Sequence, residues 1–131
     1  MGTTDDAKFA NTMGHFYQAL AGQIGEFLHT HIKSLSDGQI GILSGDEERL
    51  ISYANTFFSL SDNIAFENSA SYFKGVGDAT DAIGAAMKKI DDINKVIGIA
   101  AGCITLAAAI VSANGQGIVS SCQSILAAAK A

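Results

Sequence analysis

A run of thirty-four residues without a charged side chain, from Val96 to Ala129, constrains this chain more than any other feature of its sequence. Its first part, residues 96–111, is apolar on every face of a helix, whereas a surface helix normally carries polar residues on one face. Asn114-Gly115-Gln116-Gly117 then supplies a turn. We therefore expect a helical hairpin over about residues 96–130, here called the uncharged segment, which other elements must cover in water.

The rest of the chain carries the pattern of amphipathic helices. Apolar residues recur at steps of three and four over about residues 5–35, 45–66 and 70–97, which is the spacing of one helix face. The chain has no proline, so the commonest helix breaker is absent. We predict an all-α protein of 131 residues in a single domain, 1–131, folded as an antiparallel bundle of about four helices with the uncharged hairpin at its centre.

Local signals predict where the first two helices end and begin. Ser36-Asp37-Gly38 is expected to end the first helix, and Ser44 followed by Glu47 has the pattern of a capping box that starts the second. Each glycine inside the first helix weakens it by about 1 kcal/mol relative to alanine. We expect a neighbouring helix to approach closely at these positions, which are Gly14, Gly22 and Gly25.

The charge balance and the two cysteines bear on partners and compartment. The formal net charge is −5, and the eight basic residues form no cluster, so nucleic acid is not expected as a partner. In a hairpin that turns near Gly115, Cys103 and Cys122 would be about five residues out of register, too far apart for a disulfide. We expect two reduced, buried thiols. These thiols and the absence of a visible signal peptide mildly favour the cytoplasm without establishing the localisation.

No pattern in the sequence predicts catalysis, a cofactor or a metal site. His29 and His31 point about 200° apart on a helix, so they do not share a metal ion. Asp37 and Glu48 stand at the first and twelfth places of a calcium loop, but the middle places lack its oxygen ligands. Neither cysteine has a neighbouring basic residue in the sequence that would lower its pKa. We therefore expect a non-enzymatic protein.

Small residues form one edge of the apolar helix. Gly98 and Gly102 are four residues apart, and Thr105 and Ala109 continue the same edge. This spacing lets two helix backbones approach closely, in membranes and in soluble bundles alike. The candidate residues for helix packing or membrane activity are Gly98, Gly102, Thr105, Ala109, Ile97, Ile104, Leu106, Ile110, Ile118, Ile125 and Leu126.

The sequence is compatible with three explanations of the uncharged segment: the core of a soluble bundle, a membrane-active hairpin, or a self-association face. Its fully apolar part would span about 24 Å as a helix, less than the ~30 Å hydrocarbon core of a bilayer. That length argues against a permanent transmembrane helix. It is compatible with a conditional insertion in which the two helical arms of the hairpin enter the membrane together. Helical pore-forming toxins use a hidden apolar hairpin in this way, which is an analogy of mechanism only.

We favour a binding protein that releases the uncharged segment into a membrane or a partner protein. In this hypothesis, large apolar residues of the preceding helices keep the segment soluble. They are Phe9, Phe16, Leu20, Phe27 and Phe57. The alternatives are a soluble interaction or adaptor protein, or a carrier for an apolar ligand, in which the hairpin is simply the buried core.

Overall fold

The all-α prediction is confirmed. The structure, a computed structural model, describes residues 4–60, 69–90, 92–112 and 115–130. Within these ranges the chain forms five α-helices and one short 3-10 helix, with no strand. They are α1 (Thr4–His31), η1 (Ile32–Ser34), α2 (Asp37–Leu60), α3 (Ser69–Met87), α4 (Ile93–Val111) and α5 (Gly115–Lys130).

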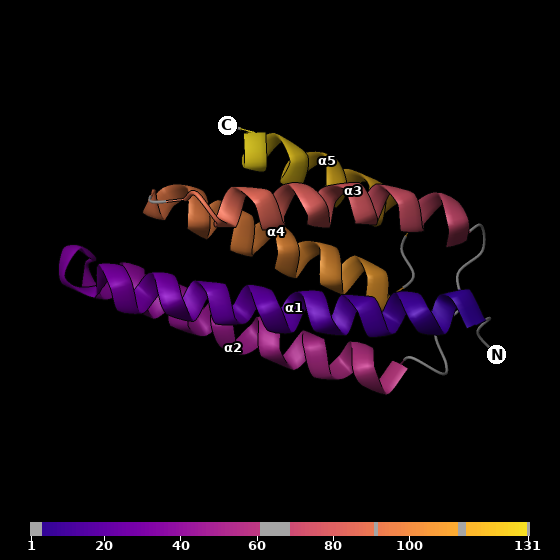
Figure 1. The fold of residues 1–131 in the computed structure, drawn as a ribbon, viewed down its shortest axis with the longest axis horizontal. Coiled ribbons are helices and arrows are strands. Elements are labelled where there is room, and N and C mark those ends of the chain that lie inside the picture. Colours follow the sequence, from indigo (N-terminus) through magenta and orange to yellow (C-terminus); the bar gives the residue numbers. More distant parts are fainter. Residues whose placement is uncertain (1–3, 61–68, 91, 113–114, 131) are drawn as a thin grey trace.

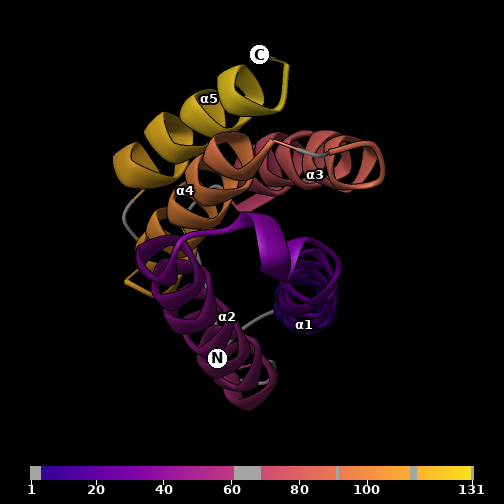
Figure 2. The same cartoon turned by 90° about the vertical axis from the view of Figure 1, so that its left-hand side faces the viewer.

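The helices contact one another in a closed ring (Figures 1 and 2). In order around the ring, α1 packs on α2, α2 on α4, α4 on α5, α5 on α3, and α3 on α1. The α1–α2 contact is the most extensive, whereas the α1–α3 and α2–α4 contacts are the sparsest of the five. The fold therefore divides into an N-terminal pair, α1 and α2, and a C-terminal trio, α3, α4 and α5.

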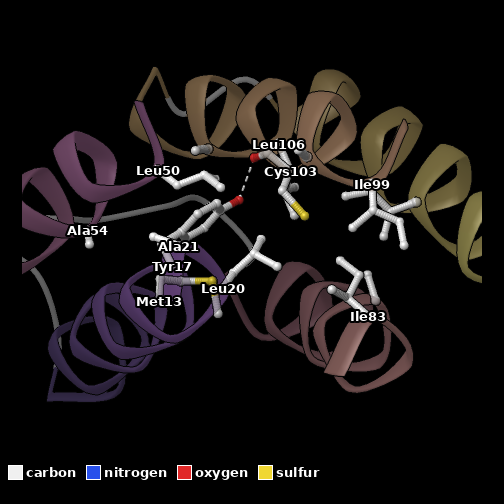
Figure 3. Packing of buried hydrophobic residues seen from close by; sticks show 14 of the residues in the cluster. Met13, Tyr17, Leu20, Ala21, Leu50, Ala54, Ile83, Ile99, Cys103 and Leu106 are labelled. Carbon is white, nitrogen blue, oxygen red and sulfur yellow. Dashed lines mark hydrogen bonds between the residues drawn. The ribbon is translucent and has the colours of Figure 1, made fainter. Parts of the chain in front are cut away.

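Side chains from both parts fill the inside of the ring. Figure 3 shows Leu20 of α1 and Ile83 of α3 pointing toward Ile99 and Leu106 of α4. All four side chains are 0–1% exposed. Among the cover residues predicted from the sequence, Phe16 is half-buried, and the other four are buried in the same core: Phe9, Leu20, Phe27 and Phe57.

The second helix begins at Asp37, eight residues before the predicted start. Its capping box is formed by Ser36 and Gln39. The Gln39 N–H donates to Ser36 Oγ at 3.1 Å, and the Ser36 N–H donates to Gln39 Oε1 at 2.9 Å, so each residue satisfies a backbone donor of the other. Ser44 and Glu47 lie inside α2, and the prediction that they start it was wrong. The predicted end at residue 66 lies outside the described residues.

The helix predicted over residues 70–97 is interrupted. α3 ends at Met87, and α4 begins at Ile93. Asp92 caps α4, because its Oδ1 accepts a hydrogen bond from the Asn94 N–H at 2.9 Å. The apolar spacing runs on through the interruption and conceals it, so a count of about four helices was one too few.

The close approach expected at the glycines of α1 occurs at two of the three. A Cβ added at Gly14 would lie 2.6 Å from Cε1 of Phe58 on α2, and the Phe58 ring also meets His15 edge-on at 5.0 Å. At Gly25 the added atom would meet the Glu47 carboxylate. Gly22 is exposed, with nothing within 4 Å. Two glycines therefore allow α2 to pack tightly on α1.

Candidate functional site

α4 is buried on one side only. It contacts α2 and α5, and its inner face is formed by Val96, Ile99, Ala100, Cys103, Leu106, Ala107, Ala109 and Ile110. Its outer edge is exposed at Gly98, Ala101, Thr105, Ala108 and Val111. The expectation that the uncharged segment forms the centre of the bundle therefore applies to the buried residues of α4 and α5, and not to the whole segment.

The candidate residues of the uncharged segment occupy three environments. Five are buried: Leu106, Ala109, Ile110, Ile118 and Ile125. Four are half-buried: Ile97, Gly102, Ile104 and Leu126. Gly98 and Thr105 are exposed.

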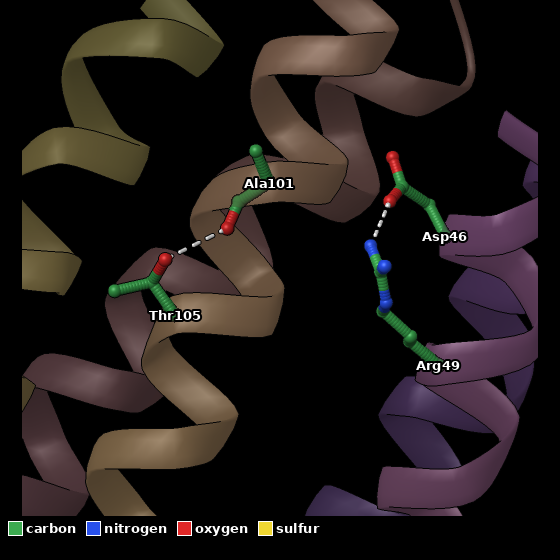
Figure 4. A network of polar contacts seen from close by, with 4 residues as sticks. All are labelled: Asp46, Arg49, Ala101 and Thr105. Carbon is green, nitrogen blue, oxygen red and sulfur yellow. Dashed lines mark hydrogen bonds and ion pairs between the residues drawn. The ribbon is translucent and has the colours of Figure 1, made fainter. Parts of the chain in front are cut away.

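The small-residue edge of α4 is divided between packing and exposure. At Gly102 an added Cβ would lie 3.0 Å from Cγ1 of Ile125, so this glycine sits directly against α5. A Cβ added at Gly98 would have no neighbouring side chain or helix within 4 Å among the described residues. The Thr105 hydroxyl donates to the Ala101 carbonyl at 3.0 Å, within α4 itself (Figure 4). The close helix contact expected along this edge is therefore present at Gly102 and absent at Gly98.

The exposed positions of residues 96–112 and 116–129 are as free of charge as the buried ones. Twelve residues in these ranges are exposed, and none is charged. A soluble protein surface is roughly 25–35% charged, so about three or four of twelve exposed positions would ordinarily carry a charge. We call them the uncharged outer positions: Gly98, Ala101, Thr105, Ala108, Val111, Ser112, Gln116, Val119, Ser120, Gln123, Ser124 and Ala127.

α4 also has the length and composition of a membrane-spanning helix. Among the described residues, Ile93–Val111 is the one helix long and apolar enough to cross a bilayer, with a mean hydropathy of 1.8 over its most apolar window. Its 19 residues correspond to about 28 Å of helix, close to the ~30 Å of a hydrocarbon core. The core helix of a soluble protein passes the same test, which rests on length and composition only, and 44% of this window is buried inside the fold.

A tyrosine of α1 reaches α4 across the core. Tyr17 is 0% exposed, and its hydroxyl donates to the Cys103 carbonyl at 2.6 Å (Figure 3). Its ring stacks on Phe57 of α2 with centroids 5.4 Å apart. Burial, together with the nearby Cys103 and Cys122 thiols, raises the pKa of Tyr17 well above its ordinary value, so the phenol stays protonated and remains a donor. From the sequence, the neighbouring Phe16 was predicted as a residue that covers the uncharged segment, and Tyr17 was missed.

A carboxylate of α2 is also buried. Asp46 is 6% exposed, and its Oδ1 lies 3.4 Å from Nη1 of Arg49, whose side chain is largely exposed (Figure 4). Burial raises the pKa of Asp46, and the Arg49 guanidinium opposes that change without cancelling it. In the sequence Asp46 resembled an acidic residue at a helix start. Because α2 begins at Asp37, Asp46 lies in the middle of the helix and not at its start.

Both cysteines are free and buried, as predicted. Burial, with a smaller contribution from the neighbouring Cys122 thiol, raises the pKa of Cys103 to about 12. Burial also raises the pKa of Cys122. A thiol with a raised pKa holds little thiolate at neutral pH and is a poor nucleophile.

Among the described residues the surface hollows include ones of about 190, 300 and 440 Å³, and there is no group of three or more His, Cys, Asp or Glu side chains that could hold a metal ion. A groove of about 190 Å³ between α3 and α5 is lined by Gly75, Asp78, Ile118, Val119, Cys122, Gln123 and Leu126. Ligand sites usually hold about 300 Å³ or more. A hollow of about 300 Å³ between the ends of α1 and α3 is lined by Gln23, Glu26, Phe27, Thr30, His31, Met87, Lys88 and Ile90.

The most distinctive feature of the fold is thus a helix that is buried on one side, exposed on the other and uncharged on both from Val96 onward. Comparison with protein-family models, with curated proteins and with solved structures found no match to this chain.

Proposed function

We propose that this is a non-enzymatic protein that acts by binding, and that α4 and α5 leave the bundle as a hairpin to enter a membrane. The uncharged outer positions carry the proposal. A helix that serves only as core requires apolar residues on its inner face, and core packing gives no reason to exclude Lys or Glu from exposed positions such as Ala101 or Thr105. A bilayer excludes charge from every side of a helix, whichever side is exposed in water.

The energetic penalty of a charge explains this selection. One charged side chain at the centre of a membrane helix costs roughly 2.5–3.5 kcal/mol, so two would oppose insertion by roughly 5–7 kcal/mol, which is comparable to the whole free energy of unfolding of a small domain. The polar residues of α5 before its terminal Lys130 are serines and glutamines. Such side chains are able to form hydrogen bonds between helices in a bilayer, which favours α5 entering together with α4 or with a second copy of the hairpin.

A single charge on the outer edge of α4 tests the proposal. Ala101→Lys places a cation at an exposed site, where substitutions normally change stability by less than about 0.5 kcal/mol. The matched control is Gln18→Lys at an exposed site of α1. Flotation with phosphatidylcholine vesicles at neutral and acidic pH should recover wild type and Gln18→Lys with the vesicles, and Ala101→Lys should stay in solution. Equal flotation of both variants, or none by wild type, would exclude insertion of α4.

The second candidate function uses the same outer positions without a membrane. A soluble interaction or adaptor protein would dock them on a partner protein or on a second copy of this chain, and the exposed Gly98 and Thr105 leave room for a close helix contact. Sedimentation of wild type and Ala101→Lys without lipid separates the two functions. Self-association that the lysine abolishes, with no flotation, favours the soluble interaction.

A further inference from the structure

The interface between the N-terminal pair and the C-terminal trio is the weakest division of the fold. Around the ring, the α1–α3 and α2–α4 contacts join the two parts, and these are the sparsest of the five. In the end view of Figure 2, α1 and α2 lie together below α3, α4 and α5. A rigid movement of the pair away from the trio would break the fewest helix contacts.

Tyr17 bridges this interface. Its ring belongs to the N-terminal pair, because it stacks on Phe57 of α2 and meets Phe16 of α1 edge-on at 5.2 Å. Its hydroxyl crosses to the trio and donates to the Cys103 carbonyl of α4 at 2.6 Å. The bond is buried and joins residues 86 positions apart in sequence. Separation of the two parts must break it.

We propose that the molecule opens in solution as two parts, the N-terminal pair and the C-terminal trio, and that the buried hydrogen bond of the Tyr17 hydroxyl is a latch that adds to the apolar contacts in favouring the closed form. This opening uncovers the inner face of α4 while α4 and α5 stay packed on each other. It supplies the regulation of the proposed function, because the uncharged segment becomes available only after the latch is broken. The purpose of the latch rests on that function, whereas the opening itself is a property of the protein in water.

A native cysteine reports the opening. Cys103 is 0% exposed, and its sulfur points into the core on the side of Leu20 and Ile83 (Figure 3). Movement of the N-terminal pair removes α1 from this side. In a Cys122→Ser background, Cys103 is the one remaining thiol, since the chain has two cysteines. Its rate of reaction with Ellman's reagent then follows the open population.

The experiment compares two variants that each lose one tyrosine hydroxyl. Tyr17→Phe keeps the aromatic ring and removes the hydroxyl that forms the latch. Tyr53→Phe is the control, because it removes the hydroxyl of half-buried Tyr53 on α2 and leaves the latch in place. The loss of one ordinary hydrogen bond should raise the Cys103 labelling rate about fivefold in Tyr17→Phe, and Tyr53→Phe should stay within about twofold of wild type. A Tyr17→Phe rate no higher than that of Tyr53→Phe would overturn the latch.

The dependence of labelling on urea tests the two-part opening itself. Partial opening exposes less surface than complete unfolding, so the Cys103 labelling rate should rise with urea less steeply than the global unfolding equilibrium. An equal slope would mean that Cys103 reacts only after complete unfolding, and would overturn the inference. Because no lipid is present, failure here is distinct from failure of the proposed function. Vesicle flotation without partial opening would contradict the two-part opening, and partial opening without flotation would contradict membrane insertion.

Discussion

Leucine at Gly98 and leucine at Gly102 should change the stability of this fold in opposite directions, although both glycines lie in α4. Each change gains about 1 kcal/mol in helix propensity. A Cβ added at Gly98 would meet no other part of the described chain within 4 Å, so that gain stands alone. At Gly102 even a Cβ would lie 3.0 Å from Ile125, and overpacking of this kind costs about 1–3 kcal/mol. Gly98→Leu should therefore raise the free energy of unfolding by up to about 1 kcal/mol, and Gly102→Leu should lower it by as much as about 2 kcal/mol.

Urea denaturation followed by circular dichroism measures both free energies of unfolding. Vesicle flotation then distinguishes easier release of α4 from the bundle from a greater affinity of the leucine-containing helix for the bilayer. The two variants gain the same side chain in the same helix, so their intrinsic affinity for a bilayer rises equally. If release from the bundle limits insertion, flotation should increase more for Gly102→Leu than for Gly98→Leu. The packing argument fails if both variants are stabilised. The release argument fails if flotation is equal while stability differs.

Other consequences of the structure are open to direct measurement. Gly14→Ala should destabilise the protein by up to about 2 kcal/mol, whereas Gly22→Ala, which adds a methyl group to open space, should stabilise it by up to about 1 kcal/mol; urea melts in which both changes stabilise would contradict the packing of α2 on α1. Because burial raises the pKa of Asp46, its protonated form contributes stability that is complete below the unfolded pKa and lost as pH rises through the folded pKa. Asp46→Asn should therefore increase the free energy of unfolding at pH 7, with the gain shrinking toward acidic pH, and a gain that does not vary with pH would refute this assignment. Thiol labelling in denaturant without reductant should count two thiols, from Cys103 and Cys122, and a count of zero in monomeric protein would show that they are bridged.

The helical class follows from the sequence because spacing and proline content are local properties. The apolar steps predicted helices over 5–35 and 45–66, and α1 and α2 occupy most of these ranges. The boundary between them was misplaced because two capping-box patterns compete, one at Ser36 and one at Ser44. Both offer the same hydrogen bonds. Only the packing of the completed helix pair decides which one is used.

The environment of the uncharged segment was less predictable than its existence. Composition shows that residues 96–129 lack charge, but the direction of each residue depends on which helices surround α4. Gly98 and Gly102 have the same sequence signal, and only Gly102 meets a neighbour. Tyr17 and Asp46 were missed for a related reason, since the burial of a polar side chain depends on partners distant in the chain.

The order of the helices along the chain has a consequence for how the protein is made. α2 ends at Leu60 and α4 begins at Ile93, so a ribosome adding roughly 5–20 residues per second completes the N-terminal pair some seconds before the first turn of α4 is synthesised. Helix formation takes about a microsecond and the docking of neighbouring helices typically milliseconds or longer. The nascent chain therefore has time to form the N-terminal pair, which covers the inner face of α4, before α4 emerges. A circular permutant that starts at α3 would reverse this order, and would leave α4 exposed to chaperones and membranes during translation.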